Sequence, residues 1–135
     1  MYKNILVPVA LDHEHSTTAA MAVAKGLRSE GGKITLLSVV EAVPGYVVSY
    51  LPEGQMEKNR HEVEDSLKAD VGDDQGVESV VITGHPGGSI VDYAKENDID
   101  LIIIASHKPG LQDFFLGSTA ARVVRYSQCA VHVLR

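Results

Sequence analysis

The chain has 135 residues, 44% hydrophobic and 22% charged, which is typical of a folded domain and not of a disordered segment. It carries 12 basic and 18 acidic residues, and this formal charge of −6 argues against a nucleic-acid or anionic-membrane partner, since both attract basic surfaces. The single cysteine, Cys129, excludes an internal disulfide framework, and no apolar run is long enough to span a membrane. We therefore expect one soluble, cytoplasmic domain over residues 1–135.

Strands and helices are expected to alternate along the chain. Runs rich in β-branched residues predict strands, and apolar residues spaced three and four apart predict helices. The expected elements are, in chain order, a strand at 5–9, a helix through 20–27, a strand at 34–40, a helix over about 53–71, a strand at 77–82, a helix from 86 through 94, a strand at 101–105, a helix from 118 through 125 and a strand at 130–134. This order predicts an α/β fold, a five-stranded parallel open sheet with helices on both faces.

The boundaries of these elements rest on local signals. Ser16 is the expected N-cap of the first helix, and the pair Gly31-Gly32 is its expected stop. Residues 41–52 predict an irregular connection, longer than such loops usually are. Three of the strands are almost continuously apolar, so both of their faces should be covered. The last strand alternates around His132, which predicts an edge or interface strand.

The loop after the fourth strand has the strongest features of a binding site. Ligands of open α/β sheets bind beyond the carboxyl ends of strands, where the strand order reverses. Here Gly117-Ser118-Thr119 opens a helix, with amides and hydroxyls at its positive end, and Lys108 is a mobile cation. This pattern is typical of an anion cradle. It is equally typical of a turn at Gly117 with Ser118 as a simple helix cap, and these residues alone leave both interpretations open.

Other polar motifs point less clearly to chemistry. His13-Glu14-His15 is interpreted as a solvated helix start, because histidines two apart do not share a helix face. His107 can bind phosphate or tie down its own loop, and the residues do not decide between the two. The glycine-rich stretch Gly84–Ser89 is interpreted as a turn and helix cap, with a pocket wall as the alternative. Cys129 is expected to be buried and inert. Walker and dinucleotide fingerprints are absent from the sequence.

Several segments together resemble the universal stress protein family over nearly the whole chain. The similar segments are Lys3–Val9, Val81–Pro86, Asp98–His107, Leu116–Ser118 and Arg125–Val133. The resemblance implies a Rossmann-like sheet of the adenine-nucleotide-binding type and a homodimer through the last strand. In one branch of the family it also implies bound ATP without an obvious catalytic apparatus.

The family's phosphate motif, Gly-x-x-Gly-x₉-Gly-Ser/Thr, is present only in part. Gly117 and Ser118 match its end, whereas Ala105 and Lys108 stand where its first two glycines belong. Eight residues, and not nine, separate Lys108 from Gly117. This shorter loop, which begins Ser106-His107, resembles a subgroup of the family that is also associated with ATP.

The loop after the first strand departs further from the family. The family typically has an aspartate two residues after the strand's proline, near the adenosine, but this chain has Pro8-Val9-Ala10 with Asp12 two positions later. Either Asp12 substitutes or the contact is lost, at a cost of about 1–2 kcal/mol, or about tenfold in affinity. Val39 matches the position whose backbone contacts adenine in the family, while its side chain is expected in the core.

These observations lead us to expect a dimeric stress-response protein that binds ATP, with Mg²⁺ bridging the phosphates where it is present. The expected contact residues are Pro8, Val9, Ala10, Val39, Ala105, Ser106, His107, Lys108, Gly117, Ser118 and Thr119. One alternative is an adaptor dimer of the same family that binds no nucleotide. Another is a slow ATPase, but the only carboxylate of the phosphate loop is Asp113, so we expect no dedicated enzyme.

Overall fold

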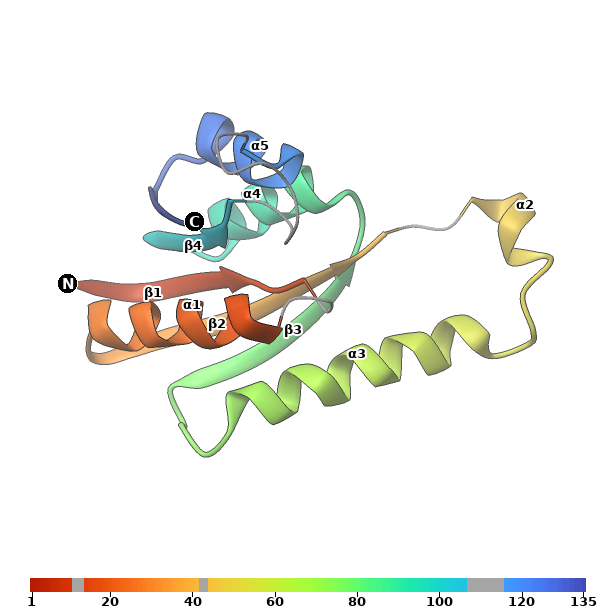
Figure 1. Cartoon of the computed structure of the whole chain (residues 1–135), viewed down its shortest axis with the longest axis horizontal. Coiled ribbons are helices and arrows are strands. Elements are labelled where there is room, and N and C mark those ends of the chain that lie inside the picture. The colour runs from red at the N-terminus through yellow and green to blue at the C-terminus, as the bar shows by residue number, and fades with distance from the viewer. Residues whose placement is uncertain (11–13, 42–43, 107–115) are drawn as a thin grey trace.

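A parallel sheet forms the centre of the molecule. The computed structural model describes residues 1–10, 14–41, 44–106 and 116–135 (Figure 1). The five strands are β1 (Tyr2–Pro8), β2 (Arg28–Val40), β3 (Val77–Thr83), β4 (Leu101–Ala105) and β5 (Ala130–Leu134). They pair in parallel in the order β3-β2-β1-β4-β5. The expected five-stranded parallel sheet is confirmed, and its two edge strands are β3 and β5.

Helices cover both faces of this sheet. They are α1 (Glu14–Leu27), α2 (Gly45–Val48), α3 (Gln55–Val71), α4 (Pro86–Glu96) and α5 (Ser118–Tyr126). In Figure 1, α1 and α3 lie on one side of the sheet, α4 and α5 lie on the other, and the short α2 stands apart. None of the helices in the described part of the chain has both the length and the apolar character to cross a bilayer.

Two apolar clusters, one on each face, hold the layers together. Ile5 and Val7 of β1 pack into the cluster below α1 and α3, and Leu6 between them packs into the cluster below α4 and α5. Successive strand side chains point to opposite faces, so a run that is buried on both sides must be continuously apolar. The helices contribute Ala20, Met21, Ala24, Val63 and Leu67 to the first cluster, and Ile90, Ala94, Ala120 and Val123 to the second.

The helix α3 shows how little apolar surface such an element needs. It spans 17 residues, yet only Val63 and Leu67 are buried. These two are four apart and share one face, while most of the other residues of the helix are exposed and many of them are charged. The helix is bounded by Gly54 (φ +78°) and Gly72 (φ +63°), whose left-handed backbones are accessible to glycine at low cost.

The predicted helix stop at Gly31-Gly32 is wrong. α1 ends at Leu27, and β2 begins directly at Arg28, so both glycines lie inside the strand. The register between β1 and β2 shifts between Tyr2 and Asn4, which marks a bulge beside the glycines. A Cβ on Gly32 would come within 2.9 Å of the Ser29 carbonyl oxygen, so close backbone approach is the reason for glycine there.

Three smaller predictions also need correction. Ser16 does not precede α1, because the helix begins at Glu14 and places Ser16 in its first turn. The connection predicted to be irregular contains the single turn α2. Cys129 is half-buried and not buried, with its Sγ 3.9 Å from the Ser127 Oγ.

Candidate functional site

The strand order places a reversal point between β1 and β4. The chain leaves β1 for β2 and β3 on one side, then returns to β4 and β5 on the other. The crevice at such a point, outside the carboxyl ends of the strands, is where open α/β sheets bind ligands. Pro8 ends β1, and the next N–H, that of Val9, donates to the Leu37 carbonyl (2.8 Å). Pro8 and Val9 are half-buried and Ala10 is exposed, so these predicted contact residues lie at the carboxyl end of β1, partly accessible to solvent.

The neighbouring strand β2 ends in two valines. Val39 is half-buried and packs against the cluster below α4 and α5, as its side chain was expected to do. The Val40 carbonyl accepts a hydrogen bond from the N–H of Gly84 (3.0 Å). Gly84 lies in the connection between β3 and α4. The carboxyl end of β2 is therefore fixed by its neighbour β3 on one side and by β1 on the other.

Ser106 is the most firmly held of the predicted site residues. It follows β4 directly, is 4% exposed, and its N–H donates to the Leu134 carbonyl of β5 (2.7 Å). Its own carbonyl accepts from the Gly117 N–H (2.5 Å). The two ends of the loop between β4 and α5 are thus joined at their base. The predicted residues His107 and Lys108, and also Asp113, lie outside the described residues.

The start of α5 decides one question that the sequence left open. Gly117 occupies the N-cap position (φ −59°) and Ser118 is the first helical residue, so Ser118 is not the cap. The first intrahelical bond runs from the Ala121 N–H to the Gly117 carbonyl (2.8 Å), and no side chain of the residues that the structure describes caps the helix. The amides of Ser118 and Thr119 therefore lie at an uncapped positive helix end, with Ser118 exposed and Thr119 half-buried.

The glycine-rich stretch before α4 serves packing as well as the turn. His85 stands at the N-cap without a side-chain cap, and Pro86 is the first helical residue, where its fixed φ is favourable. The predicted turn is confirmed, but no side chain makes the predicted cap. A Cβ on Gly87 would come within 2.7 Å of the Arg122 Cδ, so this glycine lets α5 pack on α4.

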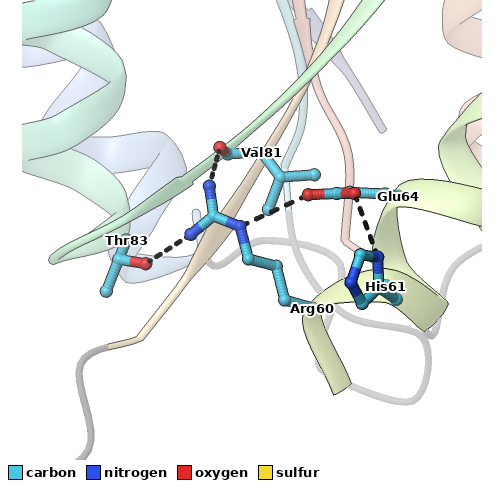
Figure 2. A network of polar contacts seen from close by, with 5 residues as sticks. All are labelled: Arg60, His61, Glu64, Val81 and Thr83. Atoms are coloured by element: carbon cyan, nitrogen blue, oxygen red, sulfur yellow. Dashed lines mark hydrogen bonds and ion pairs between the residues drawn. The ribbon is translucent and has the colours of Figure 1, made fainter. Parts of the chain in front are cut away.

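Sequence reasoning missed one polar network close to the carboxyl end of β3 (Figure 2). The Arg60 guanidinium of α3 donates to the Val81 carbonyl (3.0 Å), the Thr83 Oγ1 (3.4 Å) and the Glu64 Oε1 (3.3 Å). The His61 Nδ1 lies 3.6 Å from the other Glu64 oxygen. The only sequence signal was the spacing of Arg60 and Glu64 four apart on a helix, which is common at solvated surfaces.

The opposite, amino end of the sheet holds a hollow in which one cation and one anion are paired. Arg28 and Asp74 face each other there (2.9 Å), and the Gly76 N–H also donates to Asp74 (2.8 Å). The hydrogen bond from Arg28 is the main reason that the pKa of Asp74 lies below its usual value, and the same contact raises the pKa of Arg28. Because the cation and anion satisfy each other, the reversal point is the better candidate for a ligand site.

The fold and the uncapped helix start define an open parallel α/β protein with a potential anion site at the reversal point. The sequence profile described as "Universal stress protein family" matches residues 1–135. The chain belongs to this family.

Individual relatives agree with this assignment. Universal stress protein G of Salmonella typhimurium is 30% identical over 145 residues, covering all of both chains. The solved universal stress protein UspA from Lactobacillus plantarum superposes with a TM-score of 0.81 at 25% identity, covering 99% of this chain and 98% of that one. The universal stress protein from Archaeoglobus fulgidus, solved in complex with dAMP, shares the fold at a TM-score of 0.67 and 18% identity, covering 99% and 98%.

Proposed function

We propose that this protein binds an adenine nucleotide, ATP in particular, at the carboxyl end of its sheet and acts as a cytoplasmic, homodimeric stress-response regulator. The start of α5 carries the proposal: Gly117 is bonded to Ser106, and no side chain from residues 1–10, 14–41, 44–106 or 116–135 caps the Ser118 and Thr119 amides. Uncapped amides at a positive helix end favour a phosphate group. The family membership supports the proposal, and so does the solved structure of the Archaeoglobus fulgidus protein in complex with dAMP.

The proposed contacts divide between the two halves of the nucleotide. Pro8, Val9, Ala10 and the backbone of Val39 would face the adenosine. Ala105, Ser106, His107, Lys108, Gly117, Ser118 and Thr119 would surround the phosphates. Among the described residues no group of three His, Cys, Asp or Glu side chains could hold a metal, so Mg²⁺ would be bound chiefly through the phosphates.

Calorimetric titration with ATP tests the site. Gly117→Val places a branched side chain where the phosphate would approach, and we expect at least tenfold weaker binding. Gly26→Val is the matched control, because Gly26 lies near the end of α1, is exposed, and a Cβ there meets nothing within 4 Å. An unchanged ATP affinity in Gly117→Val, with the control also unchanged, would contradict the proposed site.

One observation favours a second function, that of an adaptor dimer without nucleotide. Ala10 lies at the carboxyl end of β1, exposed, and its methyl group cannot accept the hydrogen bond that an aspartate would. The same titration separates the two functions. A folded dimer that shows no heat of binding with ATP at millimolar concentration would be the adaptor.

We further propose that any ATP hydrolysis is slow. Phosphoryl transfer needs an oriented nucleophile and a neutralised γ-phosphate, usually with a metal held by carboxylates. The phosphate loop contains a single carboxylate, Asp113, so we expect turnover far below about 1 s⁻¹. Steady-state turnover of several per second that Asp113→Asn abolishes would overturn this part of the proposal.

A further inference from the structure

Ser106 joins two parts of the molecule that the proposed function treats separately, the nucleotide site and the edge strand β5. Its N–H donates to the Leu134 carbonyl (2.7 Å), and its carbonyl accepts from the Gly117 N–H (2.5 Å). Ser106 is 4% exposed, so breaking either of these bonds would remove a hydrogen bond from a buried backbone group. The N-cap of α5 and the last strand residue are therefore connected through one residue.

The backbone of β5 is divided between two neighbours. In a strand, the N–H and C=O groups of successive residues point to opposite sides. Because the Leu134 carbonyl faces β4 and Ser106, the groups of His132 also face β4, and those of Val131 and Val133 face the open edge. A second copy added to this edge would hold β5 from outside, while Ser106 holds its carboxyl end from inside.

β5 is also the strand of this sheet with the fewest buried residues, from which we infer that it detaches most readily. It spans five residues near the end of the chain, pairs only with β4, and none of its residues is classed as buried. Edge strands with little burial open at a small fraction of the global unfolding free energy. When the carboxyl end of β5 detaches, Ser106 loses its Leu134 partner and the base of the phosphate loop loses a fixed point.

We propose that nucleotide binding and self-association are thermodynamically coupled through Ser106, because both require β5 to be docked against β4. This inference rests on the proposed function and adds its regulation. A ligand that binds only the docked state and a second copy that pairs only with the docked state each raise its population. By linkage, the factor by which saturating ATP tightens the dimer equals the product of the factors by which dimerisation tightens ATP binding at the two sites of the dimer.

The first test compares dimer dissociation constants by sedimentation in a dilution series, with and without saturating ATP. We expect ATP to lower the dimer dissociation constant at least fivefold, the lower end of typical coupling between sites. The reciprocal measurement uses Val131→Pro, which removes an edge-facing donor. Because the two sites of the dimer share a fivefold factor, its monomer should bind ATP at least about twofold more weakly than the parent dimer.

A pair of variants at one position tests the route through Ser106. Gly117→Pro removes the N–H that donates to Ser106, and the native φ of −59° already suits proline. Gly117→Ala is the matched control, because it adds a side-chain atom but keeps the N–H. Each variant is measured at an ATP concentration that saturates it. In Gly117→Ala, ATP should still lower the dimer dissociation constant, whereas in Gly117→Pro it should not.

The outcomes distinguish this inference from the proposed function. ATP binding by the parent with a dimer constant unchanged within twofold would overturn the coupling and leave the nucleotide site standing. No ATP binding at all would overturn both. Full tightening in Gly117→Pro would overturn the route through Ser106. If Gly117→Pro does not fold, slower hydrogen exchange of the Ser106 and Gly117 amides on addition of ATP supports the inference, and unchanged exchange overturns it.

Discussion

The two edges of the sheet are built in opposite ways. At β3, Arg28 and Asp74 clamp the start of the strand, Lys33 pairs with Glu78 across from β2 (2.8 Å), and Arg60 bonds the Val81 carbonyl near its end. At β5, no side-chain ion pair involves residues 130–134 among those that the structure describes. An open edge can pair with another strand, and charged side chains discourage such pairing. The comparison shows one edge bordered by charged contacts (the closed edge) and one edge without them (the open edge), and the second is the edge that we propose pairs with a second copy.

Removing the packing of α3 should have the largest effect at the closed edge. Leu67 is fully buried where α3 packs below the sheet, so Leu67→Ala should lower the free energy of unfolding by about 2–5 kcal/mol. Urea denaturation measures this loss. Lys68→Ala, at the exposed neighbouring position, is the control and should change it by less than about 0.5 kcal/mol. Equal effects of the two variants would show that α3 does not anchor this edge.

The open edge is best tested with proline, because one strand offers a matched pair of positions. Val131→Pro removes an edge-facing donor and should weaken the dimer at least tenfold, while the fold tolerates it. His132→Pro removes a donor that faces β4 and should instead destabilise the fold. Sedimentation and thermal unfolding of both variants separate these effects. A parent protein that is monomeric at micromolar concentration would contradict the proposed use of this edge.

Arg60 offers a smaller test of the closed edge. Arg60→Ala should cost about 0.5–1 kcal/mol, because the guanidinium is half exposed and its hydrogen bonds compete with water. It should also leave the edge-facing Val81 carbonyl open, so we expect species larger than a dimer at high protein concentration. Light scattering after size-exclusion chromatography detects them. Lys58→Ala on the same helix should show none, and their absence in Arg60→Ala would mean that α3 alone closes the edge.

The smallest expected effect is the pH dependence of the clamp at the start of β3. Because Arg28 lowers the pKa of Asp74 in the folded state, the clamp stabilises the fold above the usual carboxyl pKa of about 4 and loses this effect as the pH falls further. Asp74→Asn should therefore be less stable than the parent at pH 7, and the two should converge in acid. Urea denaturation at several pH values measures the difference. A difference that is constant from pH 7 to pH 3 would exclude the ion pair as its cause.

The sequence predicted the elements of the fold because their signals are local. β4 and β5 have the predicted bounds, and α5 begins at the predicted Ser118, since each is fixed by its own run of apolar residues or by an adjacent glycine. The Gly31-Gly32 bulge could not be predicted, because it depends on how Tyr2 of β1 pairs with the neighbouring strand β2. A glycine pair looks the same in a helix stop and in a strand bulge until the partner strand is known.

The candidate site was predictable only in part for a similar reason. The helix start at Gly117 and the strand end at Pro8 follow from adjacent residues. The bonds of Ser106 to β5 and α5 join residues 28 and 11 positions apart, and those of Arg60 join α3 to β3. Such contacts depend on the packed arrangement and leave no pattern in the sequence.

The parallel sheet has a practical consequence for anyone who attaches a reporter to this protein. The N-terminal amine of Met1 contacts the Ser29 hydroxyl (2.7 Å) at the amino end of the strands. The candidate site lies at the opposite end of the sheet, beyond the carboxyl ends of the strands. Arg135 follows Leu134, whose carbonyl is bonded to Ser106. A fluorescent protein fused after Arg135 would therefore crowd both the proposed nucleotide site and the edge of β5, whereas one fused before Met1 would leave both accessible.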